Sequence, residues 1–328
     1  MSQDDSHSQT TRSLGLLMVD GFALMSYASV IEPYRAANVL AGRELYRWTH
    51  VSTGGPTATA SNGASILAET TVGELLECDV LFVFAGGDPT LFDDKRTMAW
   101  LRQIARTKAV LVGVSGGPFL LARAGLLDGY RATIHWEHRS ALQEAFPMVS
   151  VEPGLYVVDR RRVTCAGGTA GLDLAIELIE RDHGHDLSVR VSDWFIRTEA
   201  RAPTGSQRVS LRERYQLSND RLLRTLARME ASVEDPISRR ELAEAAGVSV
   251  RQLERIFSNH LHETIEQAYR RIRLEQADQL LRTTGMTILE VAIACGFSSA
   301  SQFSRSFRAH FGLSPSARRA QRRASERD

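Results

Sequence analysis

Cysteine, lysine and long apolar runs are all scarce in this chain of 328 residues. Its three cysteines, Cys78, Cys165 and Cys295, are widely spaced and form no CxxC or metal-ligand pattern. A disulfide-stapled scaffold and a cysteine metal site are therefore not expected, and we predict a reduced, cytoplasmic protein without a metal or cofactor. Only two of the 40 basic residues are lysine, which reflects genome composition or a use for the forked guanidinium.

No apolar run approaches the roughly 20 residues that a membrane-spanning helix needs. Residues 1–12 are polar and lack the apolar core of a signal peptide, so we expect a disordered tail there. The chain is long enough for two domains. From Arg208 onward it holds 21 Arg and 15 Asp plus Glu, a net charge of +6, whereas the preceding residues carry −5. A basic C-terminal third is typical of a nucleic-acid-binding module joined to another domain.

The C-terminal third contains one helical pattern twice, in Ile237–Phe257 and in Thr287–Gly312. Each copy has two short apolar-periodic segments around a glycine, Gly247 or Gly296, which tolerates the positive φ of a tight turn. Capping boxes, in which a side chain and a backbone N–H bond reciprocally, are expected at Ser238-x-x-Glu241, Ser249-x-x-Gln252, Thr287-x-x-Glu290 and Ser299-x-x-Gln302. The pattern predicts two helix-turn-helix units in tandem.

The second helix of each unit has an apolar face and an opposite face that can enter a major groove. The groove-facing positions are Arg251, Glu254, Arg255, Ala300, Ser301, Ser304 and Arg305. Between the units, Thr264–Leu281 reads as one helix, capped by Thr264-x-x-Gln267, of roughly 27 Å. Such a helix would hold two recognition helices about one duplex turn, ~34 Å, apart. The plainer alternative is a helical bundle whose arginines are merely solvated.

These features resemble the DNA-binding domain of AraC/XylS-family transcription regulators. The resemblance includes Leu253-x-Arg255-x-Phe257 and the run from Ile288 to Pro315. It implies that residues 217–320 are this domain, followed by a basic tail at 321–328, and that the seven groove-facing residues contact bases in double-stranded promoter DNA. Ala300 could offer only an apolar contact, and His262 stands where the family has glycine. The family further implies an activator, a homodimer and a contact with RNA polymerase.

Buried strands alternate with helices in the N-terminal half, which predicts a doubly wound α/β domain over residues 13–197. Val80–Ala85 is wholly apolar, as in a strand buried on both faces. The other expected strands are Ser13–Val19, Leu45–Ser52, Val110–Val114 and a hairpin of Tyr156–Val158 with Val163–Ala166. The expected helices are Phe22–Leu40, Thr97–Lys108, Pro118–Ala124 and Thr169–His183. Thr53–Asn62 reads as a loop, and residues 198–216 read as a linker.

Gly113-Val114-Ser115-Gly116-Gly117 matches G-x-S-x-G, a strand-to-helix elbow that exposes its central side chain. A serine needs a positioned base to act as a nucleophile. His135 is a candidate base, but no spacing ties it to Ser115, and any tight junction favours small residues. A hydrolase or amidase that uses Ser115 and His135 therefore stays open as an alternative function.

The wider pattern resembles the PfpI/ThiJ branch of class I glutamine amidotransferase-like domains, which are flavodoxin-like, in the version fused to AraC-type domains. The resemblance rests on Ala85-Gly86-Gly87, the elbow, Ala124–Gly129, Ala132–Trp136 and Cys165–Asp173. Enzymes of that fold carry a cysteine at the elbow, with a glutamate and a histidine beside it. The resemblance implies that Glu32 and His135 are those partners and that Ser115 replaces the thiol. We therefore expect a catalytically silent cleft that binds a ligand through Glu32, Ser115, His135 and Trp136.

The segments Glu32–Asn38 and Gly42–Trp48 resemble those of regulators that respond to glycine betaine, carnitine or related amino-acid-derived compounds. A quaternary ammonium binds aromatic faces, and its carboxylate binds arginine or backbone donors. Trp136, Phe119 and Phe22, with Glu32, are candidates for the ammonium. Ordinary core packing is the better account of Phe22 and Phe119 and an equal one of Trp136. A third alternative is an architectural DNA-binding protein that responds to no ligand.

Overall fold

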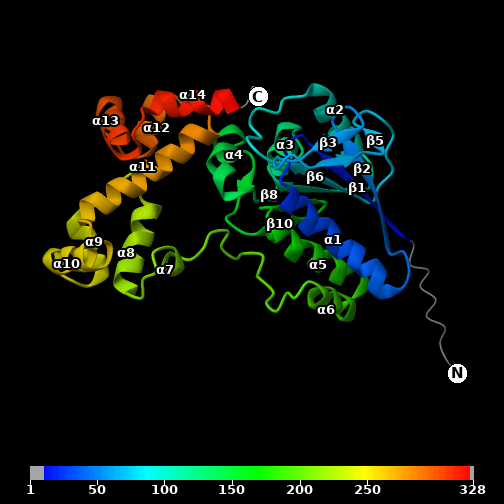
Figure 1. The fold of residues 1–328 in the computed structure, drawn as a ribbon, viewed down its shortest axis with the longest axis horizontal. Coiled ribbons are helices and arrows are strands. Elements are labelled where there is room, and N and C mark those ends of the chain that lie inside the picture. Colours follow the sequence, from blue (N-terminus) through cyan, green and yellow to red (C-terminus); the bar gives the residue numbers. More distant parts are fainter. Residues whose placement is uncertain (1–10, 326–328) are drawn as a thin grey trace. The chain divides into compact units, whose positions relative to one another are not determined.

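The computed structural model describes residues 11–325, with side chains as far as residue 321. The chain divides into two compact units, and the boundary in the sequence lies between Gln207 and Arg208 (Figure 1). The predicted tail lies outside the described residues at 1–10, while Arg12 already opens the first strand. Among the described helices, none combines the length and the apolar character that crossing a membrane requires.

The first unit is built on one twisted sheet whose described strands run in the order β10-β11-β7-β6-β1-β2-β5. The pairs are parallel except for the β10–β11 hairpin. The strands are β1 (Arg12–Met18), β2 (Tyr46–Ser52), β5 (Thr70–Thr71), β6 (Val80–Ala85), β7 (Val110–Ser115), β10 (Tyr156–Asp159) and β11 (Arg162–Cys165). This confirms the predicted doubly wound, mostly parallel sheet.

Helices cover both faces of the sheet and bury two separate cores. One face carries α1 (Leu24–Ala41), α5 (Ala170–His183) and α6 (His185–Trp194), with α1 and α5 packed side by side (Figure 1). The other carries α2 (Lys95–Ala105), α3 (Gly117–Arg123) and α4 (Arg139–Ala145). All six residues of β6 are buried between these layers, as its wholly apolar sequence predicts. The helix α1 continues through Pro33, which removes only one N–H from its ladder.

The prediction of a loop over Thr53–Asn62 is wrong in its middle. Strand β3 (Thr57–Thr59) pairs antiparallel with β4 (Ser65–Leu67) to form a small ribbon. Ala58 is buried, and Ala60 bridges to Phe22, so the ribbon covers one edge of the core. Glycine and threonine suggested a loop, but alternation about a buried alanine suffices for a strand once a core lies beneath it.

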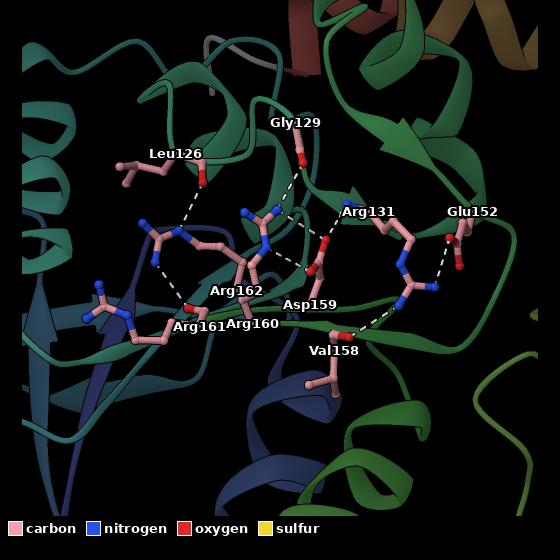
Figure 2. A network of polar contacts seen from close by, with 9 residues as sticks. All are labelled: Leu126, Gly129, Arg131, Glu152, Val158, Asp159, Arg160, Arg161 and Arg162. Atoms are coloured by element: carbon pink, nitrogen blue, oxygen red, sulfur yellow. Dashed lines mark hydrogen bonds and ion pairs between the residues drawn. The ribbon is translucent and has the colours of Figure 1, made fainter.

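Asp159 ties the β10–β11 hairpin to the earlier segment that contains Gly129 and Arg131 (Figure 2). Its carboxylate accepts bonds from the Arg131 backbone N–H at 2.9 Å and from Arg160 Nε at 3.0 Å. Arg160 also donates to the Gly129 carbonyl, and Arg162 donates to that of Leu126. This network fixes the start of the short strand β8 (Arg131–Ala132), which pairs with β9 (Ser150–Val151) and leads into His135.

The stretch predicted as a linker, residues 198–216, is divided between the two units and packs on both. The Leu155 N–H donates to the Pro203 carbonyl at 2.7 Å, so the chain past residue 198 lies against the first unit. Beyond residue 208, α7 (Leu211–Arg214) belongs to the second unit, and Tyr215 accepts a bond from Arg271. The polar composition suggested a free segment, but its hydrogen bonds are made to the two domains.

The second unit consists of helices, and its central helix belongs to two hydrophobic cores. The helices are α8 (Asp220–Ala231), α9 (Arg239–Ala246), α10 (Val250–Leu261), α11 (Ile265–Thr283), α12 (Ile288–Ala294), α13 (Ala300–Phe311) and α14 (Pro315–Ser325). The first half of α11, through Ile272, packs with α8, α9 and α10. Its second half, from Leu274, packs with α12 and α13. The predicted tandem helix-turn-helix architecture is confirmed. The predicted basic tail at 321–328 begins within α14, and residues 326–328 lie outside the described part.

The helix starts follow the predicted capping boxes with one exception. Reciprocal boxes form at Ser238, Ser249, Thr264 and Thr287. At α13, Ser299 caps the Gln302 N–H, but the Gln302 side chain accepts a bond from Ser298 at 2.7 Å instead of from the Ser299 backbone. A second serine competes for the same amide oxygen, so the fourth box of the prediction is wrong.

Each helix-turn-helix turn contains a glycine at positive φ, but the two turns are packed differently. Gly247, with φ 67°, has open space where a Cβ would lie. At Gly296, with φ 69°, a Cβ would lie 2.6 Å from the Val233 carbonyl oxygen. Arg273 of α11 closes this second turn by donating to the carbonyls of Cys295 and Gly296, at 2.7 and 2.5 Å.

We predict that Gly296→Ala destabilises the protein more than Gly247→Ala. Both place a Cβ in the left-handed region, which costs about 1–2 kcal/mol. Only Gly296→Ala adds a clash with backbone, which raises the loss by about 1–3 kcal/mol. Urea denaturation followed by circular dichroism at the helical band would measure both changes. Equal losses would show that the second turn relaxes away from the Val233 carbonyl.

Candidate functional site

The two recognition helices, α10 and α13, expose equivalent faces at positions that are 50 residues apart. Leu253 and Phe257 are buried in α10, as Phe303 and Phe307 are in α13. The predicted groove-facing residues that are exposed are Arg251, Arg255, Ser301 and Arg305. The structure therefore presents a matched pair of surfaces, each with an arginine one turn into its helix. His262 adopts φ 56° at the end of α10, in the left-handed conformation that Gly312 supplies after α13.

The remaining predicted DNA contacts are half-buried. Ala300 begins α13, and Ser304 lies beside its buried face. Glu254 already has partners, because its carboxylate accepts the Ile265 N–H at 3.2 Å and lies 3.8 Å from Arg239. A carboxylate at the start of α11 stabilises that helix terminus. Glu254 thus fixes the recognition helix α10 to α11, a function that the exposed-face pattern did not indicate.

A groove of about 520 Å³ lies between α11 and α13 within the second unit. Its lining residues are His262, Glu263, Gln267, Arg270, Arg271, Leu274, Arg305, Ser306, Ala309 and His310. Of these, only Arg305 was among the predicted contacts. The other lining residues could have been inferred from the exposed face of the connecting helix, which carries Gln267 and Arg270.

In the first unit, the predicted strand-to-helix junction at Ser115 is confirmed, but the prediction that the elbow exposes this side chain is wrong. Ser115 ends β7 with φ 61° and is only 8% exposed. Packing explains the small residues around it. A Cβ on Gly113 would lie 2.7 Å from the Pro118 nitrogen, and one on Gly117 would strike the Val83 carbonyl. The G-x-S-x-G match is therefore a requirement of the junction and is not in itself a sign of catalysis.

The side chain that approaches the elbow from α1 is that of Ser26, and the structure places Glu32 elsewhere. A Cβ on Gly167 would lie 2.6 Å from the Ser115 Cβ and 2.8 Å from the Ser26 Oγ. Glu32 lies about two turns farther along α1 and pairs with Arg35 at 2.7 Å. Ser26 stood in the same helix as Glu32 without any motif to mark it. Ser115 at the elbow and Ser26 on α1 thus lie where the enzymes of the fold are expected to have a thiol and a carboxylate.

Cys165 is the cysteine nearest to this junction, and it does not replace the missing thiol. It ends β11, is completely buried, and accepts a weak bond from the Gly167 N–H at 3.4 Å. Burial raises its pKa to about 12, so the thiol stays protonated at neutral pH. A thiolate nucleophile is therefore not available from this residue.

His135 and Trp136 are held by the backbone of the chain before them. The Thr133 N–H donates to the Thr164 hydroxyl at 2.8 Å, and the Thr133 hydroxyl donates to the Gly154 carbonyl. The His135 N–H reaches the Ser115 carbonyl at 3.4 Å, while its Nδ1 lies 3.6 Å from Glu137. Burial lowers the His135 pKa, against the opposing effect of Glu137, so the imidazole is neutral at pH 7.

A cavity of about 210 Å³ opens beside the start of α5. It is lined by His135, Trp136, Leu155, Ala166, Gly167, Gly168, Thr169, Ala170, Arg201 and Gln207. Two of the four predicted ligand-binding residues, His135 and Trp136, therefore face one hollow. Ser115 lies behind Gly167 and is not part of the lining, and neither is Glu32.

Arg201 and Gln207 were missed because they lie in the stretch that reads as a linker. Arg201 donates through Nε to Asp173 at 2.8 Å and through a second nitrogen to the Thr169 hydroxyl. The Gln207 amide nitrogen donates to the carbonyls of Ile134 and Gly154, and its buried Oε1 has no partner. The wall of the cavity is thus completed by the chain that leads directly into the second unit.

Asp173 holds this wall in place through buried ion pairs. Its side chain is 2% exposed and lies between Arg197, at 2.7 Å, and Arg201. A buried carboxylate is tolerable only where cations and hydrogen bonds replace its hydration. Asp173 therefore fixes the Arg201 guanidinium at the cavity and ties residues 197–201 to α5.

Both domains match families of known proteins. Residues 242–321 match the family described as a helix-turn-helix domain, and residues 17–181 match the DJ-1/PfpI family. Together these domains define a DNA-binding transcription regulator with a sensor-type α/β domain. The chain belongs to the AraC family of transcription regulators, in the group whose first domain is of the DJ-1/PfpI family.

The similarity to regulators extends over nearly the whole chain. The HTH-type transcriptional regulator CdhR of Pseudomonas aeruginosa is 43% identical over 304 residues, which cover 93% of this chain and 90% of the relative. GlxA of Rhizobium meliloti is 42% identical, covering 94% and 96%. Among solved structures, an AraC family transcriptional regulator from Pseudomonas putida is 26% identical, with a TM-score of 0.51. The match covers 56% of this chain and 99% of that one.

An enzyme shares part of the first domain. The isonitrile hydratase of Pseudomonas putida is 33% identical over 133 residues, which cover 40% of this chain and 57% of the enzyme. The match is shorter than those with CdhR and GlxA and does not extend over the whole enzyme.

We predict that Asp173→Asn lowers the free energy of unfolding of the first unit by about 3 kcal/mol, because two arginines lose their buried counter-charge. Tryptophan fluorescence during guanidinium denaturation would report on that unit, since the tryptophans Trp48, Trp100, Trp136 and Trp194 all lie in it. Asp193→Asn, an exposed carboxylate on α6, is the control and should change stability by less than about 0.5 kcal/mol. Similar losses in both variants would contradict a buried ion pair.

Proposed function

We propose that this regulator is controlled by a small amino-acid-derived zwitterion, such as glycine betaine, carnitine or a related compound, that binds in the 210 Å³ cavity. The observation that carries this proposal is the convergence of an arginine, a helix start, a tryptophan and a glutamine on one hollow. The volume is below that of pockets for drug-sized molecules, which suits a metabolite of a few heavy atoms.

The lining offers complementary chemistry for the two ends of such a molecule. The Arg201 guanidinium and the N-terminus of α5, which begins at Ala170, favour a carboxylate. The Trp136 ring favours an ammonium group. Gln207 also lines the cavity and has a buried Oε1 without a partner, so it suits a ligand that carries an N–H or O–H. A hydroxylated or incompletely methylated ammonium compound therefore fits better than glycine betaine itself.

Ligand binding in the cavity affects the DNA-binding unit through residues 201–207, which lead into it. Arg201 and Gln207 both contact the cavity, and Arg208 begins the second unit. A ligand that binds these two side chains restrains the segment that carries the helix-turn-helix domain. In this proposal the ligand acts by changing the freedom of residues 201–207, and the regulator works as a dimeric activator that contacts RNA polymerase in the cytoplasm.

Calorimetry on the full chain with glycine betaine, carnitine, dimethylglycine and arginine should show binding by at least one of these compounds. Trp136→Ala should weaken that binding by about 1 kcal/mol, since the ring contributes a cation–π contact. Trp194→Ala, an exposed tryptophan on α6, should leave the affinity unchanged. Absence of heat from all four compounds would remove this class of effector.

Ser115→Ala separates the proposed sensor from the alternative of a hydrolase or amidase. Because Ser115 lies behind Gly167, the substitution should leave ligand affinity and ligand-dependent DNA binding unchanged. Loss of turnover of an ester or amide substrate in this variant would favour the enzyme. A DNA affinity that no metabolite alters would favour an architectural DNA-binding protein.

Arg251→Ala and Arg305→Ala should each cost about 1–3 kcal/mol of specific binding if these side chains contact bases. The measurement is fluorescence anisotropy with a duplex that the wild-type protein selects from a random pool, compared with an unselected duplex. Arg282→Ala, which removes the same charge at the end of α11, is the control. An equal loss on both duplexes would assign the two arginines to phosphate contacts.

A further inference from the structure

His135, Glu137 and His138 form a compact cluster of ligating side chains in the first unit. One ligating atom from each residue lies within 4.8 Å of the others. The cluster follows from local geometry, because Trp136–His138 form a single turn of 3₁₀-helix that starts at His135. In such a turn, side chains three residues apart lie above one another, so the two imidazoles are neighbours with the carboxylate beside them.

Within this cluster, core packing alone does not account for the buried ring of His138. The residue is 6% exposed, and its Nδ1 is buried without a hydrogen-bond partner. The ring also lies against the backbone of Gly87. A neutral imidazole has a lone pair on one of its nitrogens, and a buried nitrogen without a partner is available to a metal ion. An unpartnered buried nitrogen otherwise costs about 1–3 kcal/mol.

We propose that His135, Glu137 and His138 bind one divalent transition-metal ion of the Zn²⁺ class. Two imidazoles and one carboxylate suit zinc and its neighbours in the first transition row, whereas Mg²⁺ and Ca²⁺ prefer oxygen ligands alone. Because the ligating atoms lie up to 4.8 Å apart, closing them around an ion requires rotation of the His135 and Glu137 side chains, which are 32% and 34% exposed.

Three protein ligands leave a coordination position open, and that position is next to the cavity. His135 belongs both to the cluster and to the cavity wall, as the neighbouring Trp136 does. Open positions of this kind take a water molecule or an oxygen of a bound ligand. The metal therefore provides a further group for an anionic oxygen in the cavity, whatever the effector is.

The test uses the untagged full-length protein, stripped with chelator and returned to metal-free buffer. Titration with ZnCl₂ against a chromophoric chelator should give one tight equivalent, and CoCl₂ should give visible d–d bands without a thiolate charge-transfer band. His138→Gln and Glu137→Gln should each weaken zinc binding by at least about tenfold. Glu137 is partly exposed, so this second variant keeps the test decisive if His138→Gln fails to fold.

His185→Gln is the matched control. It removes a solvent-exposed histidine that also lies beside a carboxylate, Glu180, but outside the cluster. This variant should bind zinc as the wild type does. The proposal is overturned if the wild type binds no zinc at micromolar concentrations. It is equally overturned if binding survives in both cluster variants, or if His185→Gln abolishes it.

Discussion

The burial of one helix in two hydrophobic cores is the constraint on which the DNA-binding half of the molecule depends. The first half of α11 is buried with α8–α10 and the second half with α12 and α13, so neither recognition helix can rotate without opening a core. Polar contacts reinforce this arrangement, because Glu254 accepts the first N–H of α11 and Arg273, in the middle of the helix, closes the turn at Gly296. A stiff spacer of about 28 Å follows from the length of this helix.

Close backbone approach plays the corresponding part in the sensor domain. Glycines at the elbow and at Gly167 let β7, α3 and the start of α5 converge with no room for a Cβ. Ser115 and Ser26 lie at this junction. The cavity beside it has a charged wall, through Arg201, that comes from the chain outside the sheet.

Much of the fold could be predicted because its signals are local. The apolar run of Val80–Ala85 and the capping boxes depend on neighbours in the sequence, and the structure agrees with them except at Ser299. The candidate site was harder. Glu32 was assigned by resemblance, and only the packing of α1 against Gly167 shows that Ser26 is the residue facing the elbow. Arg201 and Gln207 carry no motif, since polar linkers and cavity walls have the same composition.

The sequence by itself determined the class of this protein, because periodicity, caps and glycine turns report which residues are buried within each helix and strand. Tertiary structure alone decided which side chains share a space. It placed Asp173 under Arg201, set Glu254 against α11, and brought His138 to Gly87 from a distant part of the chain. Such contacts join residues far apart in sequence, and no local propensity encodes the distance between them.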